Sequence, residues 1–350
     1  MAVFFSTITY AQNINYIVSD KHSFTMKKGA LDIKSAYLKI NDTIDVFNIK
    51  DRVAGDSNYD SVGDLDGYEF GVRYGISARD TILVDYQLWN VSYDDSPLKN
   101  QKIKILNRYN LVSSKDSFFN AFSIDVGYIR DSSKPLNITS DSSLNALIQK
   151  VKPGTTVKLN DGVLVKDGST FAIYDKTGNI IKPYLSIENL KSDSYLARIL
   201  VGKVLSPNNI IDFYIGAKFI DIKTSIDFYP KDNALLNSFI GDYKSVNLDR
   251  TEKSVELGFL YTLKVYKTIF EFNYEYTKIF RDKDVSYTDE NTVIETTLAQ
   301  ELTKNALLYL GVRVMMQQFN TDVPYLYTKY TKTKFDKMYG FASFGALYRF

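Results

Sequence analysis

The chain has 350 residues, of which 45% are hydrophobic and 24% charged, and its 43 Lys and Arg residues nearly balance its 41 Asp and Glu residues. A net charge of +2 lacks the concentrated basic face that nucleic-acid binding requires, so we expect no nucleic-acid partner. The absence of Cys and the single His exclude disulfide frameworks, Cys-ligated zinc, iron–sulfur clusters and thiol nucleophiles.

The N-terminus resembles an export signal. Residues 2–8 form a short, mostly apolar stretch, and Thr9, Tyr10 and Ala11 follow at the positions that a signal peptidase reads, so we expect cleavage after Ala11. Because no Lys or Arg precedes the apolar stretch, residues 1–11 are interpreted as a truncated signal peptide, with an ordinary buried first strand as the alternative. Export would agree with the lack of Cys.

From about residue 31 onward, apolar residues recur at every second position, which is the period of a β-strand with one apolar face. In residues 68–77, for example, Tyr68, Phe70, Val72, Tyr74 and Ile76 alternate with polar or small residues. We predict about twelve strands in the ranges 31–47, 67–77, 81–93, 102–113, 117–130, 193–205, 210–227, 251–263, 267–280, 291–303, 306–318 and 338–350.

The connections between these strands alternate between short turns and long polar loops, as in a transmembrane barrel with turns on one side of the membrane and loops on the other. No apolar run approaches the ~20 residues of a membrane-spanning helix, but strands of about eleven residues are long enough to cross at a tilt. The 27 Tyr and 22 Phe suit aromatic girdles at a lipid boundary. We therefore predict an all-β, up-and-down antiparallel transmembrane β-barrel over residues 12–350. A soluble all-β protein is the alternative.

The last strand ends in a short pattern of polar, small and aromatic residues: Ser343, Gly345, Tyr348 and the terminal Phe350. The pattern resembles the C-terminal insertion signal of Gram-negative outer-membrane β-barrel proteins, and the architecture from about residue 31 onward is similar to porin-like barrels. The resemblance implies a location in the bacterial outer membrane, contact with its lipid, and recognition of the last strand by the barrel assembly machinery. It reaches no subfamily, and the oligomeric state stays open.

The polar strand faces carry charged residues, which the register turns toward the lumen. Glutamates from the eighth to tenth strands would face Arg and Lys from the second to fourth strands across a twelve-strand ring, and such walls discriminate ions. The predicted pore-lining residues are Arg73, Asp85, Lys104, Arg108, Glu256, Glu271, Glu275, Glu295 and Arg313. An open channel needs these charges unpaired and wet, whereas a filled barrel pairs them.

The connection 131–192 contains turn signals at 153–154, 160–162, 167–168 and 177–179 between short β-like runs. We expect an extracellular hairpin insertion that either folds into the pore or projects as a binding surface. A plain exposed loop is the third option.

Enzyme chemistry finds little support. The sole His22 precedes the first strand, where neither a barrel phospholipase nor a barrel protease would use it, and it is interpreted as a solvated N-terminal residue. Asp56, Asp60, Asp64 and Asp66 lack the spacing and Gly of a calcium loop, so no cofactor is expected. The sequence thus predicts a non-enzymatic channel for passive diffusion of small polar or charged solutes. The alternative is a non-conducting structural or surface-interaction barrel that acts through its extracellular loops.

Overall fold

The computed structural model describes residues 17–40, 65–91, 98–114, 117–138, 156–158, 162–167, 170–175, 177, 185–228, 246–281, 289–316, 321–326 and 339–350. The expected signal peptide, 1–11, lies outside these residues. Among the described residues, no helix is long and apolar enough to span a membrane.

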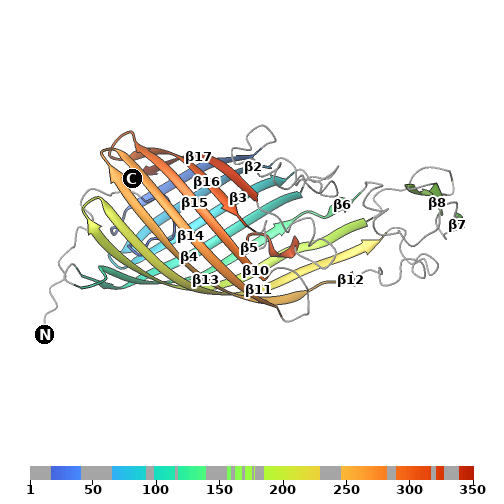
Figure 1. The fold of residues 1–350 in the computed structure, drawn as a ribbon, viewed down its shortest axis with the longest axis horizontal. Coiled ribbons are helices and arrows are strands. Elements are labelled where there is room, and N and C mark those ends of the chain that lie inside the picture. Colours follow the sequence, from blue (N-terminus) through green and yellow to red (C-terminus); the bar gives the residue numbers. More distant parts are fainter. Residues whose placement is uncertain are drawn as a thin grey trace.

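The main sheet has 14 strands, of which β6 and β12 are short, and the other twelve close into a ring (Figure 1). Each strand runs antiparallel to the next, and β17 pairs with β1 from Asp32 opposite Arg349 to Lys39 opposite Ala342. The predicted twelve-strand barrel is therefore confirmed. Its strands are β1 (Leu31–Ile40), β2 (Leu65–Ser77), β3 (Asp80–Val91), β4 (Leu98–Ser113), β5 (Ala121–Ser133), β10 (Leu185–Ser206), β11 (Asn209–Phe228), β13 (Arg250–Val265), β14 (Thr268–Arg281), β15 (Glu290–Glu301), β16 (Ala306–Met315) and β17 (Tyr339–Arg349).

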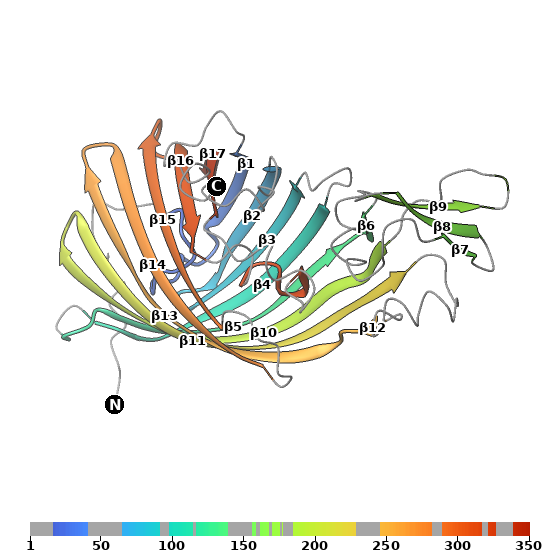
Figure 2. The same cartoon turned by 45° about the vertical axis from the view of Figure 1, so that its right-hand side comes forward.

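The bounds expected for the insertion, 131 and 192, are both wrong. Asp131 pairs with Ser192 in the ladder between β5 and β10, so both residues belong to the barrel wall. Between these two strands the chain adds β6 (Leu136–Ile138), which pairs with β10, and a separate three-stranded sheet of β7 (Thr156–Lys158), β8 (Gly162–Asp167) and β9 (Thr170–Asp175). That sheet lies beyond the long-loop end of the barrel (Figure 2), and the breaks between its strands fall at the signals near 160–162 and 167–168.

The wall alternates as the sequence predicts, with the polar face inside. On β13, Glu252, Ser254 and Glu256 are buried, while Val255 and Leu257 on the opposite face are 41% and 57% exposed. A soluble sandwich would bury the apolar face instead. The exposed apolar face is the one that lipid would cover in a membrane barrel.

Aromatic residues and charges bound this outer apolar belt on the long-loop side. The rings of Tyr37 and Tyr68 pack with centroids 5.3 Å apart, and those of Tyr128 and Tyr195 with centroids 5.6 Å apart. Two residues further along the strands, Arg130 and Asp193 form an outward ion pair of 3.9 Å. From Tyr68 to Ile76 the belt is about 20 Å high, given a rise of ~3.3 Å per residue and a strand tilt of ~40°. These dimensions approach those of a hydrocarbon layer.

Inside the wall, two tyrosine rings lie over glycines of neighbouring strands. A Cβ on Gly258 would lie 2.4 Å from the Tyr214 ring, and one on Gly345 would lie 2.4 Å from the Tyr309 ring. Only Gly leaves room for these rings, so Gly345 of the C-terminal pattern has a packing role in the finished barrel.

Candidate functional site

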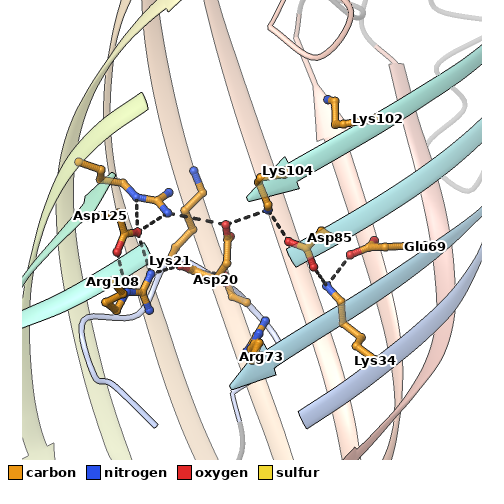
Figure 3. Close-up of polar contacts among 12 residues, drawn as sticks. Asp20, Lys21, Lys34, Glu69, Arg73, Asp85, Lys102, Lys104, Arg108 and Asp125 are labelled. Atoms are coloured by element: carbon orange, nitrogen blue, oxygen red, sulfur yellow. Dashed lines mark hydrogen bonds and ion pairs between the residues drawn. The ribbon is translucent and has the colours of Figure 1, made fainter. Parts of the chain in front are cut away.

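The lumen contains a segment of the chain itself. Residues 17–30 precede β1. Asp20 and Lys21 of this segment lie inside the barrel (Figure 3), and residues 27–29 are exposed at its rim. The segment joins the wall through a turn in which Ala30 N donates to Lys27 O (3.0 Å) and Gly29 has a φ of 79°. Gly29 N and Gly75 O then form a bond of 2.7 Å to β2. A Cβ on Gly75 would lie 2.1 Å from Lys27 O, so this approach requires glycine.

The first anchor of the segment is its own backbone. Glu271 on β14 accepts hydrogen bonds from Val18 N (2.6 Å) and Ser19 N (2.9 Å). From the other side of the lumen, Arg73 on β2 donates to Ile17 O (2.7 Å) and to Val18 O. Two predicted pore-lining residues therefore satisfy the polar groups of a chain that lies between them.

Asp20 is the second anchor. Its carboxylate lies 2.9 Å from Lys104 and 3.7 Å from Arg198, and its carbonyl accepts from Arg108 (2.5 Å). Burial alone would raise the pKa of Asp20, but the charges of Lys104, Arg198 and Lys21 hold it well below its usual range. Asp20 is thus an anion that neutralises the basic side of the wall.

Lys21 is the third anchor and points the other way. Its ammonium lies 2.5 Å from Glu275 and 3.8 Å from Glu256, and 4.8 Å from the centroid of the Tyr214 ring. Consecutive residues of the segment therefore carry opposite charges to opposite sides of the lumen. Each charge meets its complement there, which is the arrangement that stabilises buried charges.

Ser23 completes the contacts near the turns. Its amide and hydroxyl both donate to Asp212 on β11, at 2.9 Å and 2.6 Å. A Cβ on Gly202 would lie 2.0 Å from the Ser23 hydroxyl, so β10 is also shaped for this residue. The neighbouring His22 is half-buried in the lumen, which corrects its interpretation as a solvated residue. Burial, together with the charges of Arg108 and Arg73, lowers the pKa of His22 well below its usual value, so it is neutral at pH 7.

The strand charges on the basic side also pair among themselves. Arg108 contacts Asp125 at 2.7 Å, and Arg198 contacts the same carboxylate at 2.7 Å from the other side. Asp85 lies 2.8 Å from Lys104 and 3.9 Å from Lys34. These groups form one connected network with Asp20 (Figure 3).

The acidic side is paired as well. Glu256 lies 2.8 Å from Lys218, Glu295 lies 3.2 Å from Arg313, and Glu275 accepts a hydrogen bond from Tyr214 (3.2 Å). All nine predicted pore-lining residues turn inward, but the two walls do not face each other as bare charges. An open channel needs these charges unpaired and in contact with water. In this conformation they are paired.

A second segment enters the lumen from the long-loop side. Residues 321–326, which include the short 3₁₀ helix η1 (Pro324–Leu326), lie between β16 and β17 in the chain. Asp322 lies 2.9 Å from Arg313 and 3.5 Å from Lys102. Burial would raise the pKa of Asp322, but these two cations lower it below its usual value. Tyr325 belongs to an apolar cluster on this side that also contains Trp89 and Phe341.

A cavity of about 220 Å³ remains inside the barrel between these two segments. Asp20 and Lys21 line it from the short-turn side and Asp322 from the long-loop side, with Trp89 and Lys102 among the wall residues. The cavity is thus bordered by charges of both signs and could hold a small polar molecule.

Asp20, Lys21 and Asp322, through which the two segments bind the wall, are not among the residues that the sequence predicts for the site. They lie outside the alternating strands, and no local spacing connects them to their partners. One signal was present: the short polar stretch 19–22 carries both charge signs and is separated from the first strand by eight residues.

Among the described residues, no three or more His, Cys, Asp or Glu side chains are grouped so that they could hold a metal ion. Of the acidic loop residues considered for calcium, Asp56, Asp60 and Asp64 lie outside the described residues. Asp66 accepts a hydrogen bond from Asn90 (3.3 Å) on the barrel wall.

The comparisons with known proteins agree with the fold. No family model matches the sequence, and no curated protein matches it significantly. The structural neighbours are outer-membrane β-barrel proteins. The translocator domain of the autotransporter NalP from Neisseria meningitidis is 10% identical with a TM-score of 0.47, covering 93% of this chain and 90% of that one. An outer membrane channel from Pseudomonas putida F1 is 10% identical with a TM-score of 0.44, covering 96% and 100%.

The β-domain of the Bordetella autotransporter BrkA is 9% identical with a TM-score of 0.42, covering 91% of this chain and 98% of that one. Neighbours this distant say nothing about what this chain carries or binds. The class of the protein therefore rests on its own geometry, a closed twelve-strand antiparallel barrel with an apolar exterior and a charged interior.

Proposed function

We infer that the protein is a bacterial outer-membrane channel for passive diffusion of small polar or charged solutes, and that this conformation is its closed state. One observation carries the proposal: the wall alone encloses a space wide enough for a polypeptide segment, residues 17–30. A barrel filled by its own wall residues, as with about eight strands, leaves no such space.

The way the segment is held supports release. The segment binds the wall through hydrogen bonds and ion pairs, which water can replace. These contacts are made by Val18, Ser19, Asp20, Lys21 and Ser23. The polar groups of these contacts hydrate well on release. The segment also makes apolar contacts, since Val18 belongs to a buried cluster with Ile269, and Phe24 packs against Ile210. The cavity above it would then join the space that the segment vacates.

The apolar belt and its border of Tyr, Arg and Asp residues support the membrane location. The C-terminal strand, with Tyr348 and Phe350 on its outer face, would be the part that the barrel assembly machinery recognises.

A second candidate is a non-conducting barrel that acts through its extracellular part. The paired interior charges favour it, because Arg108, Asp125 and Arg198 have the geometry of a permanent core. The sheet β7–β9 beyond the barrel end would then be a surface for interaction.

The test is single-channel conductance in a planar bilayer, for the native chain and for Glu271→Gln/Glu275→Gln. The double substitution weakens the contacts to Val18, Ser19 and Lys21, so we expect rare openings of the native chain, and longer openings with altered ion selectivity in the variant. Glu290→Gln, on the exposed side of β15, is the matched control and should behave as the native chain. Silence from both native chain and double variant, when both are folded and heat-modifiable, would overturn the proposal in favour of the second candidate.

A further inference from the structure

The contacts to Asp20 and Lys21 differ from those of the rest of the segment. Val18 and Ser19 donate to Glu271 through their backbone amides, and Ser23 donates to Asp212 through its amide and its uncharged hydroxyl. Asp20 and Lys21 are held through their charged ends, by side chains from opposite sides of the lumen.

The wall around these two ends has the make-up of a ligand site. The carboxylate of Asp20 lies between Lys104 (2.9 Å) and Arg198 (3.7 Å). The ammonium of Lys21 lies beside Glu275 (2.5 Å), with a tyrosine ring 4.8 Å away. Two cations for a carboxylate, and a carboxylate with an aromatic ring for an ammonium, are common recognition elements for these groups.

Both residues also border the cavity of about 220 Å³. The site is therefore next to the space through which a solute would arrive, and a small molecule can reach it once the segment withdraws. A segment that served only to fill the lumen would have no need to present its charges beside this cavity.

We propose that Asp20 and Lys21 occupy a solute site in which they imitate the solute, and that this solute is a small zwitterion such as a short peptide carrying one carboxylate and one ammonium group. The inference rests on the proposed channel, since it names the class of compound that the channel would admit. The segment and the solute would compete for the same wall groups, so that solute entry favours the open state.

The experiment uses the full chain with Asp20→Asn/Lys21→Gln, folded in detergent. Without these two charges, the segment should no longer occupy the solute site. The sole tryptophan, Trp89, lines the cavity and reports binding by its fluorescence without any need for conduction. The probe is acetyl-Ser-Asp-Lys-amide, and acetyl-Ser-Asn-Gln-amide is its neutral analogue.

We expect a saturable fluorescence change with the charged peptide, at a Kd about tenfold or more below that of the neutral analogue, as charged hydrogen bonds supply. The native chain should bind at least tenfold more weakly, because its own segment competes. Adding Glu275→Gln to the variant should remove the preference for the charged peptide. Equal binding of both peptides, or none by a folded variant, would overturn the proposed site.

Conductance of the same variant separates the two claims. If the variant prefers the charged peptide but no variant conducts, the solute site is supported and the channel is contradicted. If the variant conducts but shows no peptide preference, the channel is supported and the solute site is contradicted.

Discussion

The carboxylate of Asp20 lies 2.9 Å from the ammonium of Lys104, a residue 84 positions further along the chain, and both side chains lie inside the barrel. The next residue, Lys21, contacts Glu275 from a sequence separation of 254. A two-residue stretch thus ties the N-terminal segment to strands on both sides of the lumen.

The buried cluster of Arg108, Asp125 and Arg198 should be the most sensitive part of the wall. Asp125 is 0% exposed, and Asp125→Asn leaves two buried guanidinium groups without their shared anion. We expect a loss of about 3–5 kcal/mol in the free energy of unfolding, measured by urea titration in detergent micelles. Lys223→Gln, which removes an exposed ion pair with Asp221, is the control and should change stability by less than about 1 kcal/mol. Equal effects of both would contradict the account of the interior.

A charged side chain should destabilise the barrel when it lies at the centre of the outer apolar belt and should be tolerated at the edge of the belt. Leu257 lies on the exposed apolar face of β13, and Leu257→Arg should destabilise the barrel in lipid vesicles by about 2–4 kcal/mol. Lys253→Glu, on the same face four residues away, should cost about 1 kcal/mol or less because it lies at the belt's edge. If the two substitutions cost the same in vesicles, this face does not lie in lipid.

The binding of the segment to the barrel wall should depend on pH through the ionisation of Asp20. Because the pKa of Asp20 lies below its usual value, its contribution is complete above that usual value, near ~4, and is lost as the pH falls through the lowered pKa. As the pH falls below about 4, the open time in planar bilayers should therefore rise. Asp20→Asn should give long openings at every pH. If Asp20→Asn keeps the rise in open time below about pH 4, the account of Asp20 is contradicted.

The C-terminal residue should matter for assembly more than for stability. Phe350 is 66% exposed, its ring lies 4.7 Å from that of Tyr348, and its amide donates to Leu31 O (2.9 Å). Phe350→Ala keeps the backbone bond, so stability after refolding in detergent should change by less than about 1 kcal/mol. The heat-modifiable fraction in cell membranes should fall severalfold. An unchanged fraction in cells would contradict recognition of this residue during assembly.

The sequence predicts the wall well because alternation is a local signal. Tyr68 to Ile76 alternate without a break, and that strand was predicted to within two residues. The start of β10 was missed by eight residues, at 193 instead of Leu185, for a physical reason. A register shift between Glu188 and Lys191 interrupts the alternation, and Asn189 adopts a φ of 56°, so periodicity disappears where the strand continues.

The contents of the lumen could not be predicted in the same way. The inward direction of Arg73, Glu271 and Glu275 follows from the strand period, but their partners lie in the segment that precedes the first strand. Nothing local distinguishes such a segment from a solvated terminus. These long-range ion pairs form only when the barrel closes, because closure brings strands from both sides of the lumen next to the segment.

The most direct measurement is conductance of a chain whose segment is tethered to the wall. The chain has no native Cys, and Met26 N donates to the Thr81 hydroxyl at 2.9 Å, so Met26→Cys/Thr81→Cys places two thiols at a contact between segment and strand for linkage by a disulfide. Combined with Glu271→Gln/Glu275→Gln, the oxidised protein should be silent and the reduced protein should open as the double variant does. Equal currents in the two redox states, with the disulfide verified, would contradict the claim that residues 17–30 close the lumen.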